Sequence, residues 1–212
     1  MIILRPLLLF MLIPFFSSRA QNFEGVVTFN VTGQGQTRAF QYFSKGNRVR
    51  VEMEQAPGMT MVVLIETKSG SVTMLIPQNN AYMEMNLDQI PSQAEDSAEA
   101  VDITETGKKE TILGYECRQV FIRQDNREAE LWVTKGLGTF VQSTVNPRSQ
   151  SAALKAIDRE ITSKGYFPLR MITRSGGTEE HRTEVVSVSK KPLSDDMFKV
   201  PAGYTKMQMP QH

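Results

Sequence analysis

The stretch RAFQYFSKGNRVRVEME, residues 38–54, decides the fold class. Phe40 and Tyr42 share one side of an extended chain, and after a short glycine-containing turn Val49 and Val51 alternate with charged residues. A period of two residues is typical of an antiparallel strand with one buried face. The stretch therefore predicts a β-hairpin with its other face in water.

The same alternation continues on both sides of this hairpin and predicts a chain built mainly of short strands. Turn residues rich in Gly, Asn and Asp separate these strands. The remaining predicted strands span residues 23–32, 59–66, 71–76, 81–86, 101–111, 115–124, 127–134, 166–174 and 179–190.

Two segments interrupt the strands. Residues 149–164 place Leu154, Ile157 and Ile161 on one face of a helix, and Gly165 follows where a helix C-cap belongs. Residues 87–101 are acidic and lack an apolar stripe, which predicts a mobile loop or a lightly packed helix. The sequence thus predicts a mainly β (α+β) fold, with one antiparallel sheet and one or two helices on a face.

The first 20 residues have the pattern of a secretory signal peptide. Arg5 precedes an apolar run that ends at Phe16, and the small residues Ser18 and Ala20 occupy the −3 and −1 positions of a cleavage site before Gln21. The run is shorter than the roughly 20 residues of a membrane span. We therefore expect a leader at 1–20, a single exported domain at 21–212 without a transmembrane span, and a periplasmic or secreted location.

Composition argues against several function classes. The chain has 212 residues, 24 Lys and Arg against 23 Asp and Glu, 2 His and 1 Cys. A balanced charge gives no electrostatic footprint for nucleic acid, and so few His and Cys residues cannot build the usual zinc sites. We expect no nucleic-acid partner, no metal site and no cofactor.

Several short motifs resemble one family. They are FEGVVTF at 23–29, KGNRVR at 45–50, TGKKETILGYEC at 106–117, WVTKGLG at 132–138 and FKVPAGY at 198–204. In their order and spacing they resemble a family of exported bacterial domains of unknown function, whose fold is similar to periplasmic lipoprotein carriers and outer-membrane lipoprotein receptors. The resemblance implies a curved sheet that forms an unclosed half-barrel, with helices over its concave face enclosing an apolar cavity.

The motifs that could support catalysis favour structural explanations. Ser187-Val-Ser-Lys190 fits a serine–lysine pattern but lies in a strand-forming run. His181 follows Glu179 and Glu180, yet neighbours on a strand point to opposite faces. Cys117 lies in an apolar strand and is expected to be a small buried hydrophobe. The sequence indicates a protein that is not an enzyme.

Methionine is over-represented after the leader. Of the 12 Met residues, six form Met-x-Met pairs, at 59 and 61, at 83 and 85, and at 207 and 209. Residues two apart in a strand share a face. Such pairs suit either an adaptable apolar lining or a Cu(I) site.

We expect a binding protein that holds an apolar ligand, such as a lipid, an acyl chain or a lipidated peptide, in the half-barrel. One alternative is an envelope scaffold or interaction protein whose core is closed and holds no ligand, and a second is a periplasmic Cu(I)-binding protein. Strand alternation nominates these lining residues: Phe40, Tyr42, Val49, Val51, Met61, Val63, Met74, Ile76, Met83, Met85, Phe121, Trp132 and Ile172.

Overall fold

The structure, a computed structural model, describes residues 23–86, 101–141 and 152–207, in which twelve strands form one sheet. The strands are β1 (Glu24–Gly33), β2 (Gln36–Lys45), β3 (Arg48–Ala56), β4 (Met59–Glu66), β5 (Ser71–Ile76), β6 (Ala81–Asn86), β7 (Asp102–Ile112), β8 (Tyr115–Gln124), β9 (Arg127–Thr134), β10 (Phe167–Ser175), β11 (Thr178–Lys190) and β12 (Thr205–Lys206). Two 3₁₀ turns, η1 (Pro77–Asn79) and η4 (Asp195–Phe198), and the helix α1 (Ala152–Lys164) complete the described elements.

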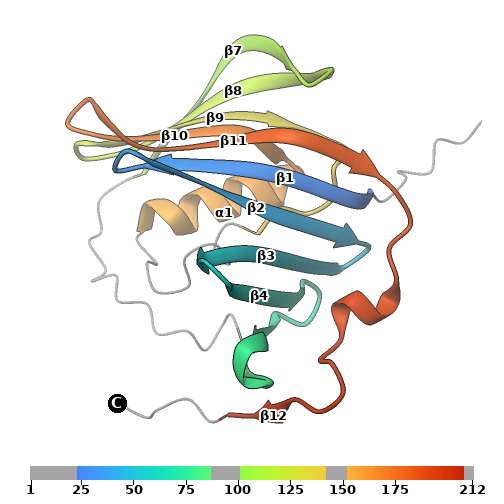
Figure 1. The fold of residues 1–212 in the computed structure, drawn as a ribbon. Coiled ribbons are helices and arrows are strands. Elements are labelled where there is room, and N and C mark those ends of the chain that lie inside the picture. The colour runs from blue at the N-terminus through green and yellow to red at the C-terminus, as the bar shows by residue number, and fades with distance from the viewer. Residues whose placement is uncertain (1–22, 87–100, 142–151, 208–212) are drawn as a thin grey trace, which may run out of the picture.

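The sheet is open, with β12 and β7 at its two edges. Its order is β12-β6-β5-β4-β3-β2-β1-β11-β10-β9-β8-β7, and every neighbouring pair is antiparallel except β12 with β6. The sheet bends around α1 (Figure 1), so we call the face toward α1 the concave face and the opposite face the outer face. The predicted mainly β fold with an unclosed sheet is confirmed.

Strand alternation predicted the strands well. The bounds of β4, β5, β6, β8 and β9 agree with the prediction, and the other long strands differ by one or two residues at their ends. The short β12 was not predicted, because only its pairing with Ala81 and Tyr82 makes it a strand. Most of the acidic segment predicted at 87–101 lies outside the described residues.

The C-terminal end of α1 follows from local sequence. The Lys164 Nζ lies 2.6 Å from a Glu160 carboxylate oxygen one turn earlier, and Gly165 adopts a left-handed φ of +61°. The Tyr166 N–H then donates to the Ile161 carbonyl at 2.9 Å. Ile161 itself is buried in the core on the concave face. No helix among the described residues is long and apolar enough to span a membrane.

An aromatic cluster forms the centre of the concave face. Phe29 and Phe40 stack with ring centroids 4.6 Å apart, and Tyr42, Phe140 and Phe167 contact one another at 5.3 to 5.7 Å. The Tyr42 hydroxyl donates to the Thr139 carbonyl at 2.7 Å. Burial raises the pKa of Tyr42. This cluster closes the middle of the half-barrel with side chains of the chain itself.

The C-terminal segment covers part of the outer face. Leu193 packs with Val26 and Phe43, while Val200 and Tyr204 pack on a second cluster from β4 and β5. The Leu193 N–H donates to the Glu24 carboxylate at 2.7 Å. The segment after β11 therefore covers parts of the outer face of β1, β2, β4 and β5.

Candidate ligand-binding face

Burial changes steadily along the rows of paired residues on the concave face. One row runs through Tyr42, Val51, Val63, Met74 and Met83 on consecutive strands. The first three are 0%, 1% and 2% exposed, whereas Met74 and Met83 are half-buried. The concave face is thus closed near β2 and becomes accessible toward β6.

Five methionines form the accessible part, which we call the methionine face. Met53 pairs with Met61 across β3 and β4, and Met74 pairs with Met83 across β5 and β6. Met85 belongs to the next row, opposite Val72. All five are half-buried, and Met53, Met61 and Met85 pack against the main core.

A cleft of about 410 Å³ adjoins the methionine face. Its floor contains Val31, Phe40 and Met53. Pairing between β2 and β3 ends at Phe40 and Met53, although β2 begins four residues earlier, at Gln36. The cleft therefore lies where these two neighbouring strands separate, and Met53 belongs both to it and to the methionine face.

The rim of the cleft is polar. Gln34, Gln36, Arg38 and His181 contribute to it, and none of the described residues that line the cleft is acidic. The Arg38 guanidinium donates to Gln36 Oε1 at 3.3 Å. The cleft thus combines an apolar floor with a rim that carries a cationic side chain.

The structure brings ten of the predicted lining residues onto the concave face. Phe40, Tyr42, Val49, Val51 and Val63 are buried there, whereas Met61, Met74, Ile76, Met83 and Met85 are half-buried. Sequence alternation alone could not separate these two groups, because both have the same period.

The other three predicted lining residues, Phe121, Trp132 and Ile172, lie on the outer face. Phe121 and Ile172 alternate with core residues of their strands, and Glu130 pairs in register with both. Trp132 is buried and contacts the core, but it shares the face of Glu130, two residues earlier in β9. The Trp132 indole N–H donates to Glu130 Oε1 at 3.0 Å. These three therefore do not join the other ten on one surface, because strand alternation gives relative and not absolute orientation.

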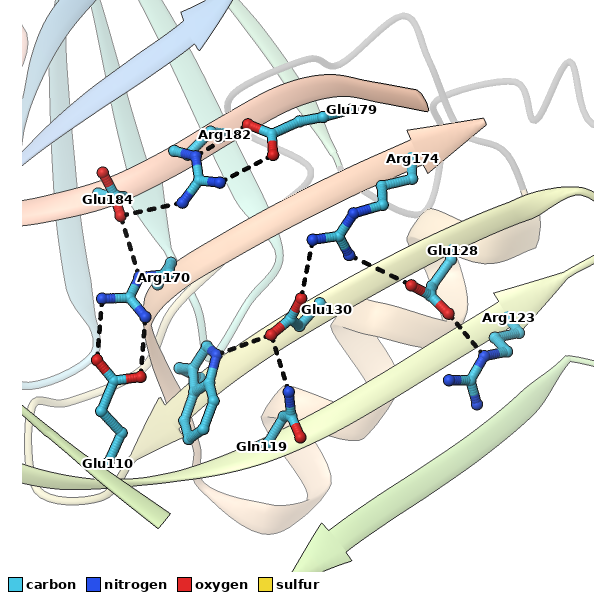
Figure 2. A network of polar contacts seen from close by, with 11 residues as sticks. Glu110, Gln119, Arg123, Glu128, Glu130, Arg170, Arg174, Glu179, Arg182 and Glu184 are labelled. Atoms are coloured by element: carbon cyan, nitrogen blue, oxygen red, sulfur yellow. Dashed lines mark hydrogen bonds and ion pairs between the residues drawn. The ribbon is translucent and has the colours of Figure 1, made fainter. Parts of the chain in front are cut away.

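Arginine and glutamate side chains form a network on the outer face of β7 to β11, on the side away from α1 (Figure 2). Arg170 makes a bidentate pair with Glu110 at 2.9 and 3.1 Å and contacts Glu184 at 3.0 Å. Arg182 joins Glu184 to Glu179. Because β8 and β9 separate β10 from β7, the Arg170–Glu110 pair links strands that are not neighbours.

A second chain of contacts centres on Glu130 (Figure 2). Arg174 joins Glu128 and Glu130 at 3.2 and 3.0 Å, and the Gln119 amide donates to Glu130 at 2.8 Å. Burial works to raise the pKa of Glu130, but hydrogen bonds from Gln119, Arg174 and Trp132 outweigh it and lower that pKa. Such a satisfied carboxylate is suited to holding strands together.

Sequence reasoning missed this network. The signal was present, because Glu128 and Glu130 alternate in β9, and Arg170 and Arg174 share a face of β10. A period of two residues does not indicate which strands become neighbours, so it could not pair these charges.

The candidate catalytic residues Cys117 and His181 lie on different strands, β8 and β11. Cys117 is fully buried, and burial raises the pKa of its thiol to about 11, which disfavours the reactive thiolate. Glu179 pairs with Arg182, whereas His181 points to the cleft. Within the described ranges, no group of three or more His, Cys, Asp or Glu side chains could hold a metal ion. Methionine sulfurs, which are soft metal ligands, are not among these four side chains.

Three solved structures share the fold. PNGF-II is 17% identical with a TM-score of 0.53, and the match covers 87% of this chain but 31% of PNGF-II, about a third of its length. An uncharacterized conserved protein from Thermus thermophilus is 13% identical with a TM-score of 0.52, covering 87% of this chain and 90% of that one. A Pseudomonas aeruginosa MucA/MucB complex is 13% identical with a TM-score of 0.50, covering 86% and 57%.

No curated protein matches the sequence significantly. The family profile described as "Domain of unknown function (DUF4412)" matches residues 23–204. This range includes eleven of the twelve described strands, all but β12, together with α1 and both described 3₁₀ turns. It also includes the five motifs on which the resemblance rested. The chain therefore belongs to the DUF4412 family, as its motifs predicted.

Proposed function

We propose that this protein is an exported, non-enzymatic binding protein that holds an acyl chain, a lipid or a lipidated peptide against the methionine face. The observation that carries this proposal is the methionine face itself, five half-buried thioether side chains, of which Met53 also lines the cleft, next to buried rows of the concave face. The leader predicted at residues 1–20 supports export to the periplasm or the exterior.

Methionine suits such a role for a physical reason. It is unbranched and polarizable, so one surface can repack around ligands of different shape. A core that serves stability alone is better specified by branched residues with few rotamers. Branched residues of this kind form the buried rows next to the methionine face: Val49, Val51, Val63 and Ile65.

The fold is compatible with binding a macromolecule as well. MucB, which shares the fold, is seen in a complex with MucA. An envelope scaffold would use the same sheet without any apolar ligand. We favour the apolar ligand because all five methionines are half-buried and Met53 lines the cleft, whereas Tyr42, Val51 and Val63 in an adjoining part of the concave face are buried.

A fluorescent fatty-acid analogue tests the proposal directly. The purified protein should bind it saturably, and unlabelled oleate should displace it. Met83→Asp should weaken binding by about tenfold or more, because the ligand would then bury a carboxylate. Val186→Asp on the exposed surface is the matched control. No saturable binding by the folded wild-type protein would leave the scaffold as the better explanation.

A paired substitution separates the lipid function from copper binding. Met83→Leu with Met85→Leu keeps volume and hydrophobicity but removes two sulfurs. We expect fatty-acid binding to stay within about threefold of wild type. Stoichiometric Cu(I) binding that disappears in this double variant would replace the lipid proposal with the metal one.

A further inference from the structure

The cleft where β2 and β3 separate has a polar rim, which has no role in binding an acyl chain. An acyl chain needs only an apolar surface, which the methionine face supplies. The cleft adds a polar rim at one end of that surface, and its floor meets the methionine face at Met53. A ligand lying across both would have an apolar part and a polar end.

Arg38 is the charged group at this rim. It lies on β2, opposite Val31 and two residues before Phe40, and its side chain is exposed. Its one described polar contact is with the neutral Gln36, at 3.3 Å. Arg48, Arg50, Arg123, Arg170, Arg174 and Arg182, in contrast, all contact described carboxylates. Arg38 is therefore available to an anionic ligand.

His181 reaches the same rim because Gly33 lies beside it. The two residues pair in register across β1 and β11, and a Cβ at position 33 would lie 2.3 Å from His181 Nδ1. A side chain on residue 33 would thus displace the imidazole. Arg38 and His181 consequently face one cleft from two strands that flank β1.

We propose that this cleft binds the anionic headgroup of the acyl ligand, a carboxylate or a phosphate, with Arg38 as its main ion-pair partner and His181 as a second donor. The proposal rests on the proposed function and narrows it to anionic amphiphiles. A guanidinium fits both headgroups through parallel N–H donors. The apolar floor of Val31, Phe40 and Met53 then accepts the first carbons of the chain.

Displacement of a bound fluorescent fatty-acid analogue by three probes tests this inference. Oleate carries a carboxylate, dodecyl phosphate carries a phosphate, and oleyl alcohol has the apolar chain of oleate without charge. Arg38→Gln should weaken oleate and dodecyl phosphate by about tenfold, the value of a charge-assisted hydrogen bond. Oleyl alcohol should change by less than about twofold. His181→Ala should give a smaller loss in the same direction.

Arg127→Gln is the matched control, because Arg127 is an exposed arginine on β9, four strands along the sheet from β2, and does not line the cleft. Circular dichroism verifies that each variant is folded. Equal losses for oleate and oleyl alcohol, or no loss for either anion, would overturn the headgroup site while leaving apolar binding intact. Failure of all three probes to bind the wild-type protein would overturn both proposals. A loss for only one anion identifies the headgroup class.

Discussion

Glu130 shows how one side chain can stabilise the outer face. Its carboxylate accepts hydrogen bonds from Gln119 and Trp132 and pairs with Arg174. These partners come from β8, β9 and β10, so one carboxylate joins three strands. They also give the indole N–H of the single Trp a partner on the outer face.

Trp132→Phe should lower the free energy of unfolding by about 1 to 3 kcal/mol. The change removes a hydrogen bond to a half-buried carboxylate and leaves part of the indole's volume empty. Urea denaturation followed by circular dichroism measures it. Val186→Ala, on the exposed surface, should cost less than about 0.5 kcal/mol. A loss for Trp132→Phe as small as that of the control would mean that the Glu130 contact contributes nothing.

Asp195 makes a pH-dependent contribution through its contacts with β2 and β3. Its carboxylate lies 2.9 Å from Lys45 and 2.8 Å from Arg48, and these partners lower its pKa to about 2. An unfolded aspartate titrates near pH 4. The stabilisation is therefore complete above about pH 4 and is lost as the pH falls toward 2.

Asp195→Asn should accordingly be less stable than wild type at pH 7, and the difference should shrink between about pH 4 and pH 2. Urea midpoints across this pH range measure the effect. Asp125→Asn, in the turn between β8 and β9, is the control. A difference that stays constant down to pH 2 would show that the charge pairing of Asp195 does not stabilise the fold.

The pairing of β1 with β11 brings the beginning and the end of the domain together. Gly25 lies opposite Lys190, and a Cβ at Gly25 would lie 2.2 Å from the Ser189 carbonyl oxygen. That oxygen belongs to the backbone of the neighbouring strand. The close approach explains why the FEGVVTF motif has glycine at this position.

Gly25→Ala should therefore lower the free energy of unfolding by about 1 to 3 kcal/mol, because a strand must move to admit the methyl group. Gly35→Ala is an informative comparison. It has a positive φ of +74° but no atom within 4 Å of its Cβ, so only its backbone conformation is penalised. Thermal and urea unfolding of both variants compare these costs. A Gly25→Ala protein as stable as wild type would show that β11 yields to the added methyl.

Considered as a whole, the molecule has one concave surface divided into a sealed part and an accessible part. Val63 and Met83 lie in the same row, two strands apart, and yet Val63 is 2% exposed while Met83 is half-buried. Side chains of the same apolar character thus have different surroundings. The division predicts different responses to an introduced charge.

Val63→Asp should unfold the protein, because a buried carboxylate without a partner is too costly to retain. Met83→Asp should leave the protein folded, because its carboxylate can reach water. Circular dichroism and size-exclusion chromatography distinguish the two outcomes. Unfolding by both substitutions would indicate that the methionine face is a closed core and would favour the scaffold.

The amino-acid sequence determined the strands, the helix and the family. A period of two residues with glycine turns is a local signal, and β4, β5, β6, β8 and β9 follow it to the residue. Gly165 likewise ends α1 where the sequence predicts, because its left-handed φ requires only local geometry. These features depend on residues that are close together in the chain.

Tertiary structure alone decided which face each strand presents and which apolar residues remain accessible. Alternation assigned Met83 and Trp132 to one lining, but the curvature and register of the sheet put them on opposite faces. The cleft exists because β2 and β3 separate beyond Phe40, and His181 reaches it from β11, far away in sequence. Burial and charge pairing depend on contacts between distant strands, which a local pattern does not encode.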